Sequence, residues 1–189
     1  MSDEASALVL VAEGTEEMEA VISIDVLRRG GIEVTVAGVD GIDPIRCSRG
    51  VVLSPDVALE DVEGDFDILV LPGGAEGAQR LAESNRVGDL LRRQEESGRL
   101  VGAICAAPIA LAAHAVFENR QLTSHPSVKE LLAEWGDYKE HPVVADGNLI
   151  TSRGPGTAFA FALRIVGTLT DAKRMVEVRA TMMFPVQVS

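Results

Sequence analysis

Short apolar runs alternate with amphipathic stretches along the whole of this 189-residue chain. Four apolar runs have the length and composition of buried strands, at residues 7–12, 32–38, 67–74 and 100–104, the third closed by a Pro-Gly-Gly turn. Between and after them, helical patterns predict helices at residues 16–29, 87–97, 107–117, 126–135 and 156–169, and a shorter helix from Ala172. The pattern therefore alternates strand and helix from one end to the other.

The remaining segments carry turn signals. Thr15 is the expected cap of the first helix, and Gly30 and Gly31 are expected to end it. Residues 45–55 predict short strands and turns, residues 122–125 a strand end, and residues 141–152 a hairpin that turns at Asp146 and Gly147. No repeat, low-complexity tract or linker interrupts the alternation. We therefore predict one domain over residues 1–189, a doubly wound α/β sheet between helices.

Composition agrees with that fold and excludes several functions. Hydrophobic residues make up 47% of the chain but aromatic residues only 4%, so aliphatic side chains must fill the core, as in parallel sheets. The net charge of −12 disfavours binding to nucleic acid or to an anionic membrane. Residues 100–117 contain no charged side chain, yet Pro108 and the many alanines favour a buried strand and helix over a membrane span. After the first strand the sequence AEGTEEME lacks the glycines of a dinucleotide site.

Cys105 is the first candidate for chemistry, because the pattern predicts that an apolar strand turns there directly into a helix. Such a junction exposes a side chain on a tight turn, and alanines around it allow the turn to close. The helix start is expected to lower the pKa of the thiol and to raise its reactivity. The alternative, a buried cysteine that acts as a small hydrophobic residue, stays open on these grounds.

Glu19 is the second candidate. It belongs to an acidic run that would ordinarily be solvated, but Ile22 and Val26 place it at the border of the apolar face of its helix. A carboxyl group held there would be partly desolvated, with a raised pKa, and able to carry a proton.

Other residues near the expected strand ends have two readings each. The amides of Gly73 and Gly74 suit a developing oxyanion or an ordinary turn, and His125 suits a general base or a capping residue. Arg49 and Arg153 suit an anionic substrate group or an ion pair. Cys47 is expected to be a bystander; two cysteines without a pairing pattern, and no secretory signal, favour a reducing, cytoplasmic setting. The histidines lack metal-ligand spacing, so no metal is expected.

Taken in order, seven segments resemble the ThiJ/PfpI superfamily, and within it the branch of Parkinson disease protein 7. They are residues 7–21, 34–38, 43–52, 70–79, 102–114, 122–129 and 146–163. The resemblance implies a flavodoxin-like fold, a homodimer, and a nucleophilic Cys105 beside a protonated Glu19 that lowers the thiol pKa. It implies pocket roles for His125, Arg49 and Arg153, and an anion site at the amides of Gly74 and Ala106. The tail from Val178 departs from the family's pattern.

The same resemblance implies an activity. Members of this family are described as glutathione-independent glyoxalases that convert methylglyoxal to lactate and glyoxal to glycolate, with a related deglycase activity, and no cofactor is expected. The alternative is a redox-sensing, cytoprotective or chaperone protein whose cysteine is oxidised to the sulfinic acid. Both readings depend on Cys105 and Glu19, so the sequence does not separate them.

Overall fold

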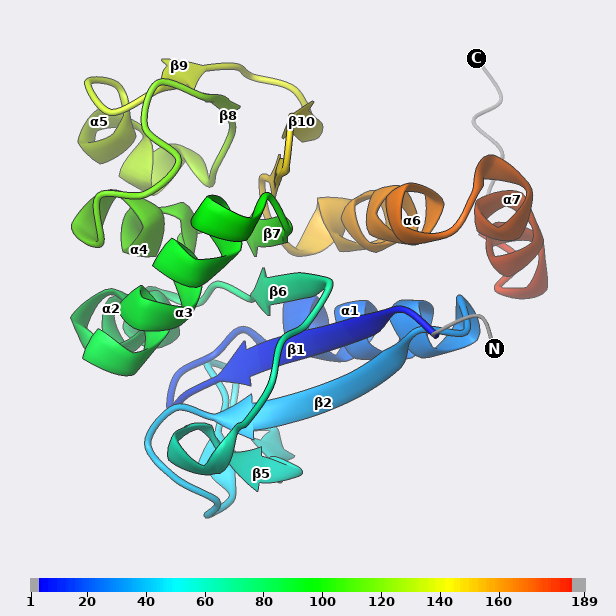
Figure 1. Ribbon diagram of the computed structural model, residues 1–189, viewed down its shortest axis with the longest axis horizontal. Helices are drawn as coiled ribbons and strands as arrows, with labels where there is room; N and C mark the ends of the chain where they lie inside the picture. Colours follow the sequence, from blue (N-terminus) through cyan, green and yellow to red (C-terminus); the bar gives the residue numbers. More distant parts are fainter. Residues whose placement is uncertain (1–3, 185–189) are drawn as a thin grey trace.

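A computed structural model describes residues 4–184, and its centre is a seven-stranded sheet (Figure 1). The strand order is β10-β11-β7-β6-β1-β2-β5. In that order the strands are β10 (Val143–Asp146), β11 (Leu149–Ser152), β7 (Leu100–Ile104), β6 (Ile68–Leu71), β1 (Ser6–Val11), β2 (Glu33–Gly38) and β5 (Val57–Ala58). All neighbours pair in parallel except β10 and β11, which form the expected antiparallel hairpin. The predicted doubly wound, mostly parallel sheet is confirmed.

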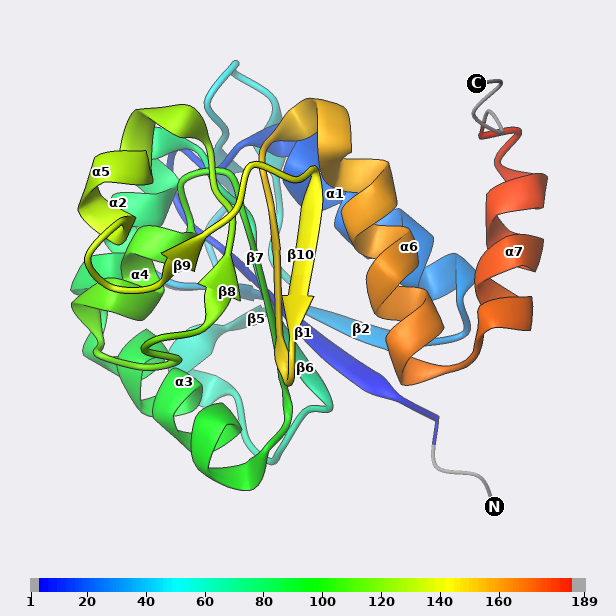
Figure 2. The ribbon, with the colours of Figure 1, turned by 90° about the horizontal axis from the view of Figure 1, so that it is seen from above.

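Helices cover both faces of the sheet (Figure 2). On one side lie α1 (Glu17–Arg29), α6 (Ala158–Leu169) and α7 (Ala172–Thr181); on the other lie α2 (Ala75–Glu83), α3 (Asn85–Ser97), α4 (Pro108–Ala113) and α5 (Lys129–Leu132). The alternation of side chains along β1 explains the two cores. Val9 packs with the α1 and α6 cluster, whereas Leu8 and Leu10 pack with the cluster of α3 and α4. No described helix is long and apolar enough to cross a membrane.

Short elements complete the chain. β3 (Ile45–Arg46) pairs with β4 (Val52–Leu53), and β8 (Gln121–Leu122) pairs with β9 (Asp137–Tyr138). Two 3₁₀ turns, η1 (Leu59–Asp61) and η2 (Pro126–Val128), precede β6 and α5, and a third, η3 (Pro155–Thr157), leads into α6. The short final helix that was expected from Ala172 is α7, while residues 185–189 of the departing tail lie outside the described residues.

Several predicted boundaries were wrong, for local reasons. α4 ends at Ala113 instead of residue 117, because Ala115 and Phe117 adopt left-handed backbone angles that a helix cannot contain. The helix expected at residues 126–135 is only the 3₁₀ turn η2 followed by one turn of α5. The helix α2 was missed, since its sequence is short and contains Gly77, which packs against Thr15.

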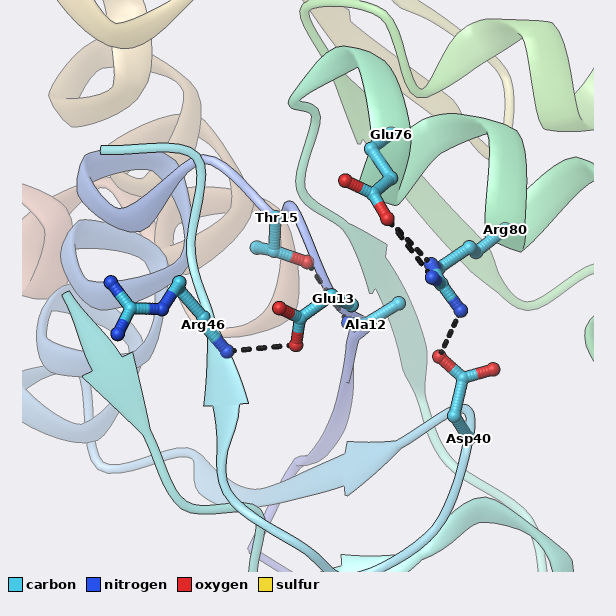
Figure 3. A network of polar contacts seen from close by, with 7 residues as sticks. All are labelled: Ala12, Glu13, Thr15, Asp40, Arg46, Glu76 and Arg80. Atoms are coloured by element: carbon cyan, nitrogen blue, oxygen red, sulfur yellow. Dashed lines mark hydrogen bonds and ion pairs between the residues drawn. The ribbon is translucent and has the colours of Figure 1, made fainter. Parts of the chain in front are cut away.

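The cap of α1 also differs from the prediction. Glu16, not Thr15, caps the helix, and its carboxylate accepts the N–H of Glu19 at 2.8 Å. The hydroxyl of Thr15 instead accepts the N–H of Ala12 at 2.9 Å, which closes the turn after β1 (Figure 3). This turn brings the start of α1 over the carboxyl ends of the parallel strands, where ligands bind in open α/β sheets.

Candidate active site

Cys105 lies on a strained turn between β7 and α4. Its φ of +63° falls in the left-handed region, which non-glycine residues adopt at a cost and which recurs at functional sites. The turn is held on both sides: the N–H of Cys105 donates to Ser152 O at 3.0 Å, and the N–H of His125 donates to Cys105 O at 2.8 Å. The side chain is half-buried. The predicted strand-to-helix junction is therefore confirmed, with a thiol that remains in reach of small molecules.

Glu19 lies beneath this turn with no solvent exposure at all. One carboxyl oxygen, Oε2, accepts the N–H of Gly73 at 2.7 Å, while the buried Oε1 has no partner of standard hydrogen-bond geometry. The carboxyl group nevertheless lies close enough to Cys105 for each group to shift the pKa of the other. Burial is the main cause that raises the pKa of Glu19 from 4.5 to about 7. The expectation of a raised pKa is confirmed.

The expectation of a lowered thiol pKa was wrong for the resting pair. Burial first, and then the Glu19 carboxylate, raise the pKa of Cys105 to about 12, against smaller lowering effects of the N–H groups of Gly74 and Ala106. α4 begins only at Pro108 and has six residues, so its dipole adds little at the sulfur. The effect of Glu19 belongs to its ionised form. A protonated Glu19 adds no negative charge and can donate to the sulfur, so the protonation states of the two groups depend on each other.

The two glycines after β6, Gly73 and Gly74, have amides that bond to different side chains. The amide of Gly73, expected at an oxyanion, is occupied by Glu19, so that part of the prediction was wrong. A Cβ atom on Gly73 would lie 2.6 Å from Cβ of Cys105 and 2.8 Å from Oε2 of Glu19, which shows how closely the three residues meet. The amides of Gly74 and Ala106 instead bond to the Cys105 side chain and favour its anion. These two amides are therefore the groups around Cys105 that favour a negative charge on its sulfur.

His125 and the two arginines make different contacts around this centre. The imidazole Nδ1 of His125 is bonded to Ser127, and no hydrogen bond among the described residues joins its ring to the sulfur. The N–H of Arg49 donates to Glu17 at 2.8 Å, and its guanidinium bonds to Ser48 O at 3.2 Å. Arg153 is half-buried in the turn after β11, near enough to Lys129 and Glu140 to affect the pKa of both. Of these three residues, only His125 is hydrogen-bonded directly to the backbone of Cys105.

A polar network beside the α1 turn was not anticipated from the sequence (Figure 3). Arg80 of α2 bonds to Glu76 at 2.9 Å and to Asp40 at 3.1 Å, which ties α2 to the loop after β2. Glu13 accepts the N–H of Arg46 at 2.9 Å. Because these partners lie up to 40 residues apart, only the fold brings them together. Among residues 4–184, no three His, Cys, Asp or Glu side chains converge in an arrangement that could hold a metal ion.

These features define a class of proteins: flavodoxin-like α/β domains with a cysteine on a strained turn above a buried carboxyl group. The chain belongs to the DJ-1/PfpI family, whose sequence profile matches residues 5–168.

Two curated relatives match most of the chain. It is 49% identical over 178 residues to Parkinson disease protein 7 homolog of Danio rerio, and 46% identical over 177 residues to glutathione-independent glyoxalase DJR-1.2 of Caenorhabditis elegans. Each match covers 92% of this chain and 94% of the relative. The crystal structure of Drosophila melanogaster DJ-1beta superimposes with a TM-score of 0.95 at 50% identity, over 97% of this chain and 100% of that one.

Proposed function

We propose that this protein is a glutathione-independent glyoxalase that converts methylglyoxal to lactate and glyoxal to glycolate. The observation that carries the proposal is the pair formed by Cys105 and the fully buried Glu19, whose pKa of about 7 allows it both to give and to take a proton near neutral pH. A relative of 46% identity bears the name of that activity. Deglycation of early methylglyoxal adducts would use the same groups.

The first step forms a carbon–sulfur bond. The pair holds one proton, and in the form with Glu19 protonated the thiolate of Cys105 attacks the aldehyde carbon of methylglyoxal. The aldehyde oxygen gains the electron pair of the broken π bond and takes the proton from Glu19, giving a neutral hemithioacetal. The N–H groups of Gly74 and Ala106, which favour the thiolate in the free site, lie where they can stabilise the negative charge that develops.

The second step moves hydrogen between the two substrate carbons. Glu19 is now a carboxylate, and it removes the proton of the former aldehyde carbon to give an enediolate with its negative charge on the former ketone oxygen. The hydroxyl proton on the first carbon's oxygen moves to that oxygen, and Glu19 returns its proton to the neighbouring carbon, which gives a thioester of lactate. Water then cleaves the carbon–sulfur bond, releases lactate and restores the thiol. One water is consumed overall, and no external oxidant or reductant enters the balance.

The test compares lactate formation by wild type, Cys105→Ser and Cys47→Ser in glutathione-free buffer that contains no other thiols or amines. Cys105→Ser should lose turnover by about 10³-fold or more, because a serine hydroxyl is not ionised by this site. Cys47→Ser is the matched control and should retain the wild-type rate. Lactate formation that survives in Cys105→Ser would reject the covalent mechanism, and no lactate from reduced wild type would reject the function.

A second function, redox sensing, is favoured by the same two amides. A sulfinate formed when two molecules of peroxide oxidise Cys105 in turn, each releasing water, would carry its negative charge where Gly74 and Ala106 already favour an anion. A protonated Glu19 would donate to one sulfinate oxygen. This role needs an oxidant but no dicarbonyl substrate.

A further inference from the structure

The ring of His125 is held by Ser127 in a way that fixes where its proton lies. His125 precedes the 3₁₀ turn η2, and its Nδ1 atom lies 2.8 Å from Ser127 Oγ and 3.2 Å from Ser127 N. A backbone amide can only donate, so Nδ1 must accept the hydrogen bond. In a neutral imidazole one nitrogen accepts and the other bears the hydrogen, which therefore sits on Nε2.

We propose that Ser127 is a positioning residue that locks His125 in its Nε2–H form, so that His125 donates a hydrogen bond to a substrate oxygen and does not act as a general base. This inference rests on the proposed glyoxalase function for the identity of the substrate, but the state of the ring is independent of it. It replaces the expectation that His125 removes a proton.

The main chain around His125 is fixed as firmly as its ring. Its N–H donates to Cys105 O at 2.8 Å, and its carbonyl accepts the hydroxyl of Ser124 at 3.0 Å. Tyr138 Oη donates in turn to Ser124 O at 3.0 Å. The ring is thus carried by a backbone bonded directly to the nucleophile's own turn. Such support keeps a donor in place before substrate arrives.

The other ring nitrogen is available. No described residue bonds to Nε2, and the side chain is exposed to solvent. Gly154, in the turn after β11, lies beside the Cδ2 edge of the ring, where even an added Cβ atom would approach no closer than 3.8 Å. The Nε2–H is therefore exposed and without a hydrogen-bond partner among the described residues, so a ligand oxygen can accept from it.

The arrangement divides the chemistry between two residues. Glu19, buried beside the sulfur, carries the protons of the reaction. His125 bonds to the ketone oxygen of methylglyoxal, which becomes more negative as the enediol forms. For His125 to take up a proton at Nδ1, the ring would have to give up the hydrogen bond from the backbone N–H of Ser127, which opposes that role.

Nuclear magnetic resonance of the imidazole nitrogens tests the ring directly. In ¹⁵N-labelled protein at alkaline pH, long-range ¹H–¹⁵N correlations should show an unprotonated Nδ1 and a protonated Nε2, with His125→Gln used to assign the signals. Ser127→Ala removes the hydroxyl but keeps the backbone amide that donates to Nδ1, so the ring should stay in its Nε2–H form, with a shift of the Nδ1 signal that Ser127→Thr reverses. A protonated Nδ1 in wild type or in Ser127→Ala would overturn the proposal.

Turnover supplies the second readout. His125→Ala should lower kcat by about 10²-fold, as for loss of one oxyanion donor. Glutamine can place an N–H near the position of Nε2 but cannot act as a base, so His125→Gln should retain clearly more of the kcat than His125→Ala. Equal losses in the two variants would overturn the donor role. Failure of the proposed function has a different signature, because wild type would then make no lactate while the ring signals remained as expected.

Discussion

The two cysteines of this chain are both buried to a degree and both lie near carboxylates, but the carboxylates beside them differ. At Cys47, burial and the charges of Glu17, Glu16 and Glu13 raise the pKa of the thiol to about 11. At Cys105, burial and Glu19 raise it to about 12. Judged by pKa alone, Cys47 would be the more acidic thiol.

The difference lies in whether the neighbouring carboxylate can lose its charge. Glu17 is buried, and desolvation is the largest single cause that acts on its pKa, but the hydrogen bonds that it accepts, including those from Ser48 and Arg49, together outweigh it and lower the pKa, so Glu17 remains charged beside Cys47. Glu19 has a pKa of about 7 and can be protonated beside Cys105. Only Cys105 also has backbone amides that favour its anion. The proposed reactivity of Cys105 therefore depends on a neighbour whose charge can be switched, more than on the resting pKa of the thiol.

Glu19→Gln is the variant with the largest expected effect on this contrast. It removes the switchable charge and the proton carrier while keeping the shape, so lactate formation should fall by about 10² to 10⁴-fold.

The free energy of unfolding should change in the opposite direction and increase in Glu19→Gln. The raised pKa means that the folded chain keeps a proton that the unfolded chain releases between pH 4.5 and about 7. Wild-type stability therefore falls across this range by about 3 kcal/mol because of Glu19.

The measurement is urea unfolding of wild type and Glu19→Gln at several pH values. The variant should gain about 3 kcal/mol relative to wild type between pH 4 and pH 8, because glutamine has no charge to bury. A stability difference that stays constant with pH would show that Glu19 has an ordinary pKa in the folded chain. Glu19 would then stay charged near neutral pH as Glu17 does, and the proposed difference between the two carboxyl groups would be rejected.

Peroxide treatment probes the same contrast through oxidation. Thiolates are oxidised before thiols, so Cys105 should gain two oxygen atoms while Cys47 stays reduced. Mass spectrometry of peptides that contain each cysteine measures both, and Cys47→Ser serves as the matched control for the whole-protein mass. Equal oxidation of both cysteines would contradict a sensing role that depends on the surroundings of Cys105. Selective oxidation together with absent lactate formation would favour sensing over catalysis.

The sequence predicted the sheet, the turn at Cys105 and the border position of Glu19 because each depends on residues close together in the chain. The pattern of apolar runs placed the strands, and Ile22 and Val26 placed Glu19 at the edge of the apolar face. The occupied amide of Gly73 was not predictable, because Glu19 reaches it across 54 positions of the chain. The thiol pKa was wrong for a similar reason: the helix start is local and visible, whereas burial by the fold is not.

Ser127 shows a signal that was visible but not used. A hydroxyl residue two positions after a histidine, with Pro126 between them at the start of a helical turn, is the spacing at which a side chain bonds to a following amide. A capping role for His125 was one of the alternatives left open by the sequence, and the structure confirms it. The spacing did not indicate that the cap would also fix the ring tautomer, since this follows only from the distances to Nδ1.

Glu17→Gln should produce the smallest effect and the finest test of the comparison. Glu17 is the charged group that raises the pKa of Cys47 most, so its removal should lower the pKa of that thiol and raise its rate of alkylation by iodoacetamide. The increase should be less than about tenfold, since one pKa unit corresponds to tenfold in thiolate fraction. Cys105 alkylation should stay unchanged, because Glu17 is not among the groups that shift its pKa.

Loosening of the loop would also expose Cys47, and Ser48→Ala separates the two causes. That variant removes the 2.8 Å hydrogen bond to Glu17 but keeps the carboxylate charge. If charge holds Cys47 in the thiol form, Glu17→Gln raises alkylation at Cys47 and Ser48→Ala does not. Equal increases in the alkylation rate would mean that burial alone protects Cys47. The permanent charge of Glu17 would then not explain why Cys47 is the less reactive cysteine.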